Sequence, residues 1–131
     1  MTELLRLAQE WFQRGENDLK TAQIALSGGA PSGTVAVLLH QACEKYIKGF
    51  LIYHGWQLIR THNLVFLLRE AMKSNSHLAK FVDLAGTLTS EYLEERYPPG
   101  PTVEFSNEGI KELLAETQNL ILILKEAVQP H

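Results

Sequence analysis

Apolar residues recur at steps of three and four through four long segments of this 131-residue chain. At about 100° per residue, that spacing places them on one face of an α-helix. The segments lie at about 4–26, 32–54, 76–96 and 107–128, and a shorter one covers about 64–73. Four such helices with short connections predict an all-α fold, an antiparallel up-and-down four-helix bundle with one additional short helix.

Turn-forming residues separate these segments. Glycines and a proline fill 27–33, Gly55 can end the second helix, and three prolines within 98–101 prevent continuation of the fourth. Thr61 or Asn63 can cap the short helix, and Ser106 can cap the last one. Neither a strand nor an internal repeat stands out, so we expect residues 1–131 to form a single domain.

Composition excludes several classes of protein. Hydrophobic residues make up 45% and charged residues 21%, which is a globular rather than a disordered balance. The net charge of −3 lacks the basic excess of a protein that coats nucleic acid. The single cysteine, Cys43, excludes an intrachain disulfide, and the apolar run 120–124 is far too short to span a bilayer. We therefore expect a cytoplasmic protein without a membrane partner.

A polar stripe runs along the second helix. His40, Glu44 and Lys48 are each four residues apart and stack on one side, with Gln41 and Lys45 beside them. Two interpretations stand. The stripe is either an ordinary solvated helix face or, together with other polar residues, one wall of a ligand pocket.

Metal and cofactor chemistry have little support in the residues. The five histidines form no metal-binding pair at helical spacing with carboxylates, Glu-x-x-His does not occur, and one cysteine supports no zinc cluster. No glycine-rich loop with the spacing of a triphosphate cradle is present. We expect neither a metal nor a cofactor, and Cys43 is predicted to pack in the core.

Three parts of the chain together resemble the HEPN family, named for nucleotide binding in higher eukaryotes and prokaryotes. They are NDLKTA (17–22), HQACEKYIKGFL (40–51) followed by THNL (61–64), and EERYP (94–98). The resemblance implies a helical bundle that is commonly a homodimer. It also implies a small nucleotidyltransferase as partner in a toxin–antitoxin-like arrangement, and either nucleotide binding or metal-independent RNA cleavage.

The ribonuclease members of that family carry an arginine followed after four to six residues by a histidine. Here Arg96 is followed by Tyr-Pro-Pro-Gly-Pro-Thr, and Arg69 reaches His77 only after seven residues. The sequence thus favours a non-catalytic module that binds nucleotide or RNA. The alternatives are a divergent ribonuclease using Arg96 with His40 or His62, and a purely structural subunit. The predicted ligand-binding residues are Arg96, Tyr97, His62, His40, Lys45, Lys48 and Glu44, with no catalytic residue assigned.

Some apolar residues lie off the main stripes. Leu122 and Ile123 on the last helix, with Val37, Leu51 and Ile52 on the second, are expected to leave apolar surface that one bundle does not bury. This pattern favours a homodimer.

Overall fold

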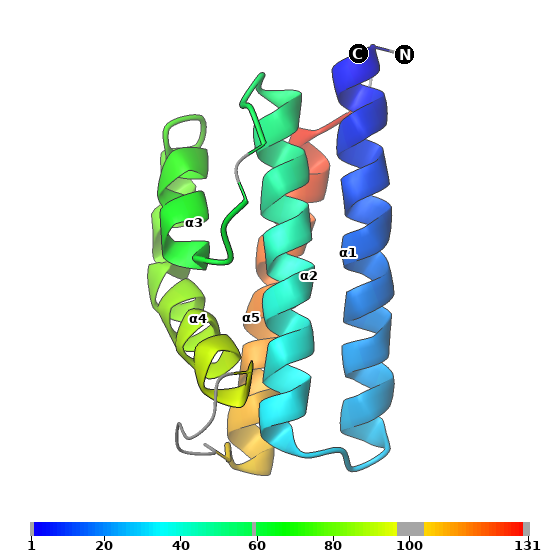
Figure 1. The fold of residues 1–131 in the computed structure, drawn as a ribbon, viewed down its shortest axis with the longest axis vertical. Helices are drawn as coiled ribbons and strands as arrows, with labels where there is room; N and C mark the ends of the chain where they lie inside the picture. Colours follow the sequence, from blue (N-terminus) through cyan, green and yellow to red (C-terminus); the bar gives the residue numbers. More distant parts are fainter. Residues whose placement is uncertain (1, 59, 97–103, 130–131) are drawn as a thin grey trace.

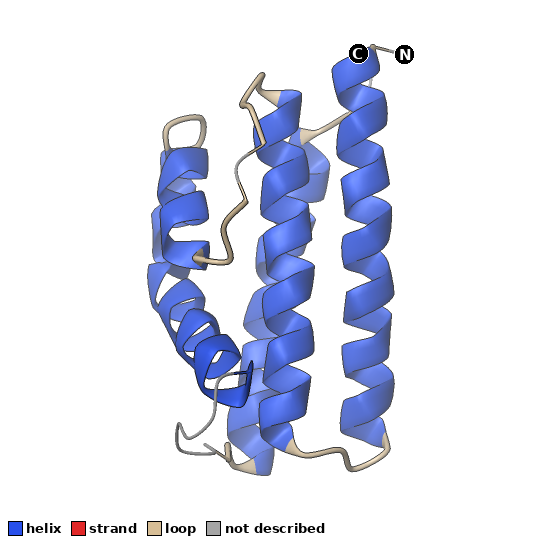
Figure 2. Cartoon of the chain, viewed as in Figure 1, coloured by secondary structure: helices blue, strands red, loops and turns tan. Residues whose placement is uncertain are grey.

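The computed structural model describes residues 2–58, 60–96 and 104–129, without the side chains of 94–96. Its elements are α1 (Glu3–Ser27), α2 (Ser32–Tyr53), α3 (Leu64–Met72), the 3-10 helix η1 (Ser76–Phe81), α4 (Val82–Arg96) and α5 (Asn107–Ala127). Every regular element of the described chain is a helix (Figure 2). The predicted all-α fold is therefore confirmed.

Three of the described α-helices, α1, α3 and α5, begin where a short polar side chain caps them. Thr2 accepts a hydrogen bond from the amide of Leu5 at the start of α1. Asn63 and Ser106 do the same for α3 and α5, as the sequence indicated. The sequence did not predict η1. There Asn75 accepts from the amide of His77, and a tighter 3-10 turn precedes α4.

Helix α2 is the centre of the molecule. It packs against α1 on one side, against α3 and α4 on the other, and against α5 (Figure 1). Of its 22 residues, 15 are buried, which is the pattern of a helix covered all round. Leu51 and Ile52 are among them. The expectation that these two residues contribute exposed apolar surface was therefore wrong, because neighbouring helices of the same chain cover them.

Two glycines allow α1 to approach α2 closely. A Cβ at Gly15 would lie 2.6 Å from Cδ2 of Tyr46, and one at Gly49 would lie 2.8 Å from Cδ1 of Phe12. A Cβ at Gly49 would also lie 3.0 Å from the carbonyl oxygen of Ala8, which belongs to the backbone of α1. The contact at Gly49 therefore fixes the distance between the two helices.

Substituting Gly49 tests this contact. Gly49→Ala should lower the free energy of unfolding by about 1–2 kcal/mol, because overpacking of typically about 1–3 kcal/mol outweighs the gain in helix propensity. Gly86→Ala is the control, since no described atom beyond its chain neighbours and the backbone of its own helix lies within 4 Å of its Cβ position in α4. It should raise the stability by about 0.5–1 kcal/mol. Urea unfolding of both variants measures the difference, and a stabilised Gly49→Ala would contradict the packing argument.

Candidate functional site

The polar stripe of α2 lies inside the fold. His40 is completely buried, Glu44 is 8% exposed and Lys48 is 5% exposed. The stripe faces the segment that leads into α3, where His62 lies, and also faces α4. The interpretation of these three residues as a solvated helix face was therefore wrong. A periodic pattern assigns residues to helix faces, but it does not say which faces another element will cover.

Both carboxylate oxygens of Glu44 are engaged. The ammonium group of Lys48 donates to Oε2 at 2.9 Å, and Nδ1 of His62 lies 2.8 Å from Oε1. A buried carboxylate is tolerated only when opposite charge and hydrogen bonds compensate for its lost hydration. On α1, the ring of Trp11 lies 5.8 Å from the Lys48 ammonium and covers it.

His40 holds the backbone of the same segment. Its Nε2 lies 2.8 Å from the carbonyl oxygen of His62, and since a carbonyl only accepts, Nε2 carries the proton. Its Nδ1 lies 4.0 Å from Oε1 of Glu44 and has no hydrogen-bond partner among the described residues. Burial lowers the pKa of His40, against opposing effects from the bond to His62 and the Glu44 charge. The ring is therefore held neutral.

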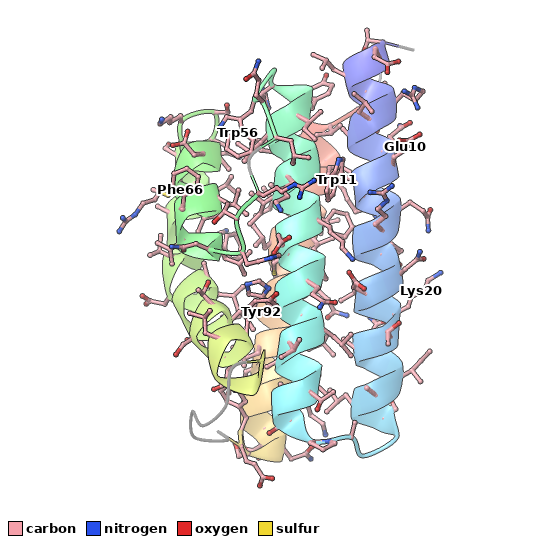
Figure 3. The ribbon with its side chains drawn as sticks, in the orientation of Figure 1. Glu10, Trp11, Lys20, Trp56, Phe66 and Tyr92 are labelled. Atoms are coloured by element: carbon pink, nitrogen blue, oxygen red, sulfur yellow. The ribbon has the colours of Figure 1, made fainter. Side chains whose placement is uncertain are left out.

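Tyr92 of α4 completes this cluster (Figure 3). Its ring stacks on His40 at a centroid distance of 4.3 Å and an interplanar angle of 16°, and it lies 5.2 Å from the ring of His62. The sequence alone did not single out Tyr92 as a site residue. The available signal was its position in the fourth helical segment, four residues before Arg96 in the sequence.

These residues surround a pocket of about 290 Å³, lined by Gln41, Glu44, Lys45, His62 and Tyr92. His62 contributes the most accessible group, because its side chain is 59% exposed. The ammonium group of Lys45 is paired with Asp18 of α1 at 2.5 Å. The pocket is therefore bordered by two ion pairs, Lys45 with Asp18 and Lys48 with Glu44. The charges within each pair balance, and the side chain of His62 is more exposed than those of Lys45 and Glu44.

The structure thus brings together five of the seven predicted ligand-binding residues. Lys45, Glu44 and His62 line the pocket, while His40 and Lys48 lie behind it and contact its walls. The side chain of Arg96 and all of Tyr97 lie outside the described residues. The predicted approach of Arg96 to His62 therefore stays a prediction.

The HEPN domain matches residues 8–127, which is nearly the whole chain. This chain belongs to the HEPN family. The assignment confirms the resemblance seen in the three sequence motifs. Among curated proteins, no match reaches significance.

Solved structures share the HEPN fold with this chain. TT1696 from Thermus thermophilus is similar with a TM-score of 0.76 at 22% identity, over 91% of this chain and 96% of that one. ST0689, described as an archaeal HEPN homologue, has a TM-score of 0.74 at 24% identity, over 93% and 98%. At such low identity the likeness shows the fold alone.

Metal binding, membrane insertion and thiol chemistry find no support in the described residues. Among the described residues, no three His, Cys, Asp or Glu side chains gather to hold a metal ion. No described helix combines the length and apolar character needed to cross a membrane. Cys43 is buried against Thr117, and burial raises the pKa of its thiol to about 12. It therefore packs as a core residue, as predicted, and is not a nucleophile.

The lowered pKa of His40 makes stability depend on pH. Below about pH 6.5 the unfolded chain takes up a proton on His40 more readily than the folded chain does. The stability that His40 contributes is therefore present above that pH, and it is lost as the pH falls through the lower pKa of the folded state. We expect the unfolding free energy of the wild type to decline more steeply in this range than that of His40→Gln.

Urea titrations between about pH 7.5 and pH 5 measure this difference. His77→Gln removes an exposed histidine of η1 and should keep the wild-type slope. Equal slopes for His40→Gln and the wild type would show that His40 is not held neutral by burial.

Proposed function

We propose that this HEPN protein binds a nucleotide or an RNA segment in the pocket beside His62, and that it does so without catalysis. The supporting observation is an accessible imidazole fixed by a buried carboxylate, at the wall of a pocket that also holds a lysine. Burial of a carboxylate costs free energy unless partners compensate it, and charged groups arranged in this way at a cleft are candidates for a functional site.

Each wall suits a different part of such a ligand. The Lys45 ammonium contributes positive charge for a phosphate, which would share it with Asp18. Gln41 offers an amide that can both donate and accept hydrogen bonds, as the edge of a base requires. Arg96 and Tyr97 remain proposed as further contacts to phosphate and base. His40 and Lys48 do not line the pocket; they hold His62 and Glu44 in place from behind it.

Calorimetric titration tests this proposal. Nucleoside mono- and triphosphates and a short single-stranded RNA should include at least one ligand that binds. Lys45→Ala and His62→Ala should each weaken that binding at least about tenfold, roughly 1.4 kcal/mol. Lys73→Ala is the matched control, because it also breaks a lysine–carboxylate pair but lies at the C-terminal end of α3, outside the residues that line the pocket. Absence of binding by all these ligands would contradict the proposal.

One observation favours metal-independent RNA cleavage as a second candidate. An imidazole oriented by a carboxylate is the arrangement that general bases use. Incubation of the purified protein with RNA in EDTA tests this candidate. Cleavage that His62→Ala abolishes and His77→Ala preserves would replace the binding-only proposal, whereas intact RNA would exclude this activity.

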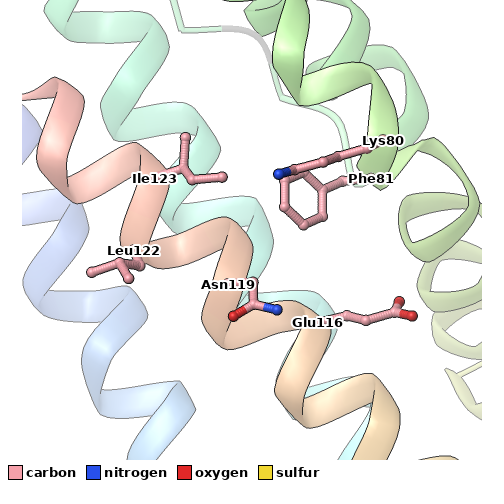
Figure 4. A pocket seen from close by; sticks show the side chains of 6 residues that line it. All are labelled: Lys80, Phe81, Glu116, Asn119, Leu122 and Ile123. Atoms are coloured by element: carbon pink, nitrogen blue, oxygen red, sulfur yellow. The ribbon is translucent and has the colours of Figure 1, made fainter.

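We also propose that the protein associates as a homodimer and binds a nucleotidyltransferase as its partner. A groove of about 430 Å³ lies between η1 and α5, where Lys80 and Phe81 face Ile123 (Figure 4). Leu122 on α5 is 55% exposed. Lys80 and Glu116 line the same groove with opposite charges, which suits a two-fold contact between identical copies. Sedimentation velocity measures the oligomeric state, and a monomer at all concentrations would contradict the proposed dimer.

A further inference from the structure

We propose that Glu44 and Lys48 are positioning residues that fix the tautomer of His62, so that its Nε2 presents a lone pair to the pocket. The use of that lone pair rests on the proposed function. The tautomer itself follows from contacts within the chain and can be measured without any ligand.

Lys48 holds one carboxylate oxygen of Glu44. An ammonium group only donates hydrogen bonds, and Lys48 Nζ lies 2.9 Å from Oε2 of Glu44. That oxygen must therefore act as the acceptor. Because the Lys48 side chain is only 7% exposed and the Glu44 side chain 10% exposed, water has little room to replace either partner. Lys48 thus orients the carboxylate of Glu44.

The other carboxylate oxygen of Glu44, Oε1, faces His62. Oε1 of the oriented carboxylate lies 2.8 Å from Nδ1 of His62, and a carboxylate oxygen accepts. Nδ1 therefore carries the proton, and in the neutral ring the lone pair lies on Nε2. Nε2 is on the side of the ring away from Glu44, in a side chain that is 59% exposed. The lone pair is therefore available at the surface.

The backbone that carries His62 is also held in place, by contacts with α2 and α4. His40 donates through Nε2 to the His62 carbonyl, and the amide of Leu64 donates to Oγ1 of Thr89 on α4. The backbone on which His62 is mounted is thus tied to α2 and α4. The two histidines are assigned opposite tautomers, with the proton on Nε2 in His40 and on Nδ1 in His62.

This assignment narrows the ligand chemistry. In its neutral form, His62 offers the pocket an acceptor, which suits a group that donates a hydrogen bond, such as a sugar hydroxyl. A fully ionised phosphate oxygen has no proton to donate and is left to Lys45. The pocket is therefore arranged for a hydroxyl on one side and a negative charge on the other.

Replacing Glu44 by glutamine should invert the tautomer of His62. Lys48 can only donate, so it takes the amide oxygen, and the amide NH₂ group is left facing Nδ1 of His62. Because that group donates, Nδ1 becomes the acceptor and the ring proton moves to Nε2. A purely structural role for Glu44 predicts no such exchange.

Two-bond ¹H–¹⁵N correlation spectra of the full chain, labelled on histidine nitrogens, measure both states. At about pH 8.5, well above the usual imidazole pKa of about 6.5, wild-type His62 should show a protonated Nδ1 and a bare Nε2, and His40 the reverse. Glu44→Gln should exchange the two signals of His62, while Glu70→Gln, the same change on α3, should leave them as in the wild type.

A wild-type His62 with the proton on Nε2, or averaged between tautomers, would overturn the proposal, and so would a folded Glu44→Gln that keeps the wild-type pattern. If Glu44→Gln loses its helical circular dichroism signal, the wild-type spectrum alone decides the tautomer. A failed nucleotide titration would count against the proposed function and leave these spectra unchanged. The two failures are therefore distinguishable.

Discussion

The carboxylate of Glu44 is the constraint around which the centre of this molecule is arranged. It is buried on the middle helix, where a carboxylate loses several kcal/mol of hydration free energy that partners of its oxygens must compensate. Lys48 satisfies one oxygen from the same helix, and His62 satisfies the other from the segment before α3. One carboxylate thereby joins a contact within α2 to a contact across 18 residues of sequence.

The rest of the bundle makes this arrangement rigid. Gly15 and Gly49 let α1 approach α2 closely, and Trp11 then covers the ammonium of Lys48. On the opposite side, Tyr92 of α4 stacks on His40. An imidazole mounted on such a support has little freedom to reorient, and a binding site needs that property if it is to hold one ligand in one geometry.

The proposed binding site does not require a net positive charge on the protein. Its two lysines are each paired with a carboxylate, which agrees with the net charge of −3. Recognition would then depend on the placement of a few hydrogen-bonding groups and not on a general attraction to polyanions. Membership of the HEPN family fixes the fold, but folds host many functions. The chemistry has to be argued from these side chains.

The sequence by itself determined the α-helices and, apart from the start of α4, their approximate ends, because apolar spacing and capping by Asn63 or Ser106 are local properties. It also identified the polar stripe of α2 and His62 as candidates. Only the tertiary structure decided that the stripe is buried, that Tyr92 belongs to the site, and that η1 precedes α4. His40 meets a carbonyl 22 residues away, and Tyr92 comes from a helix further along the chain. Such contacts depend on which elements pack together, and no local pattern encodes that.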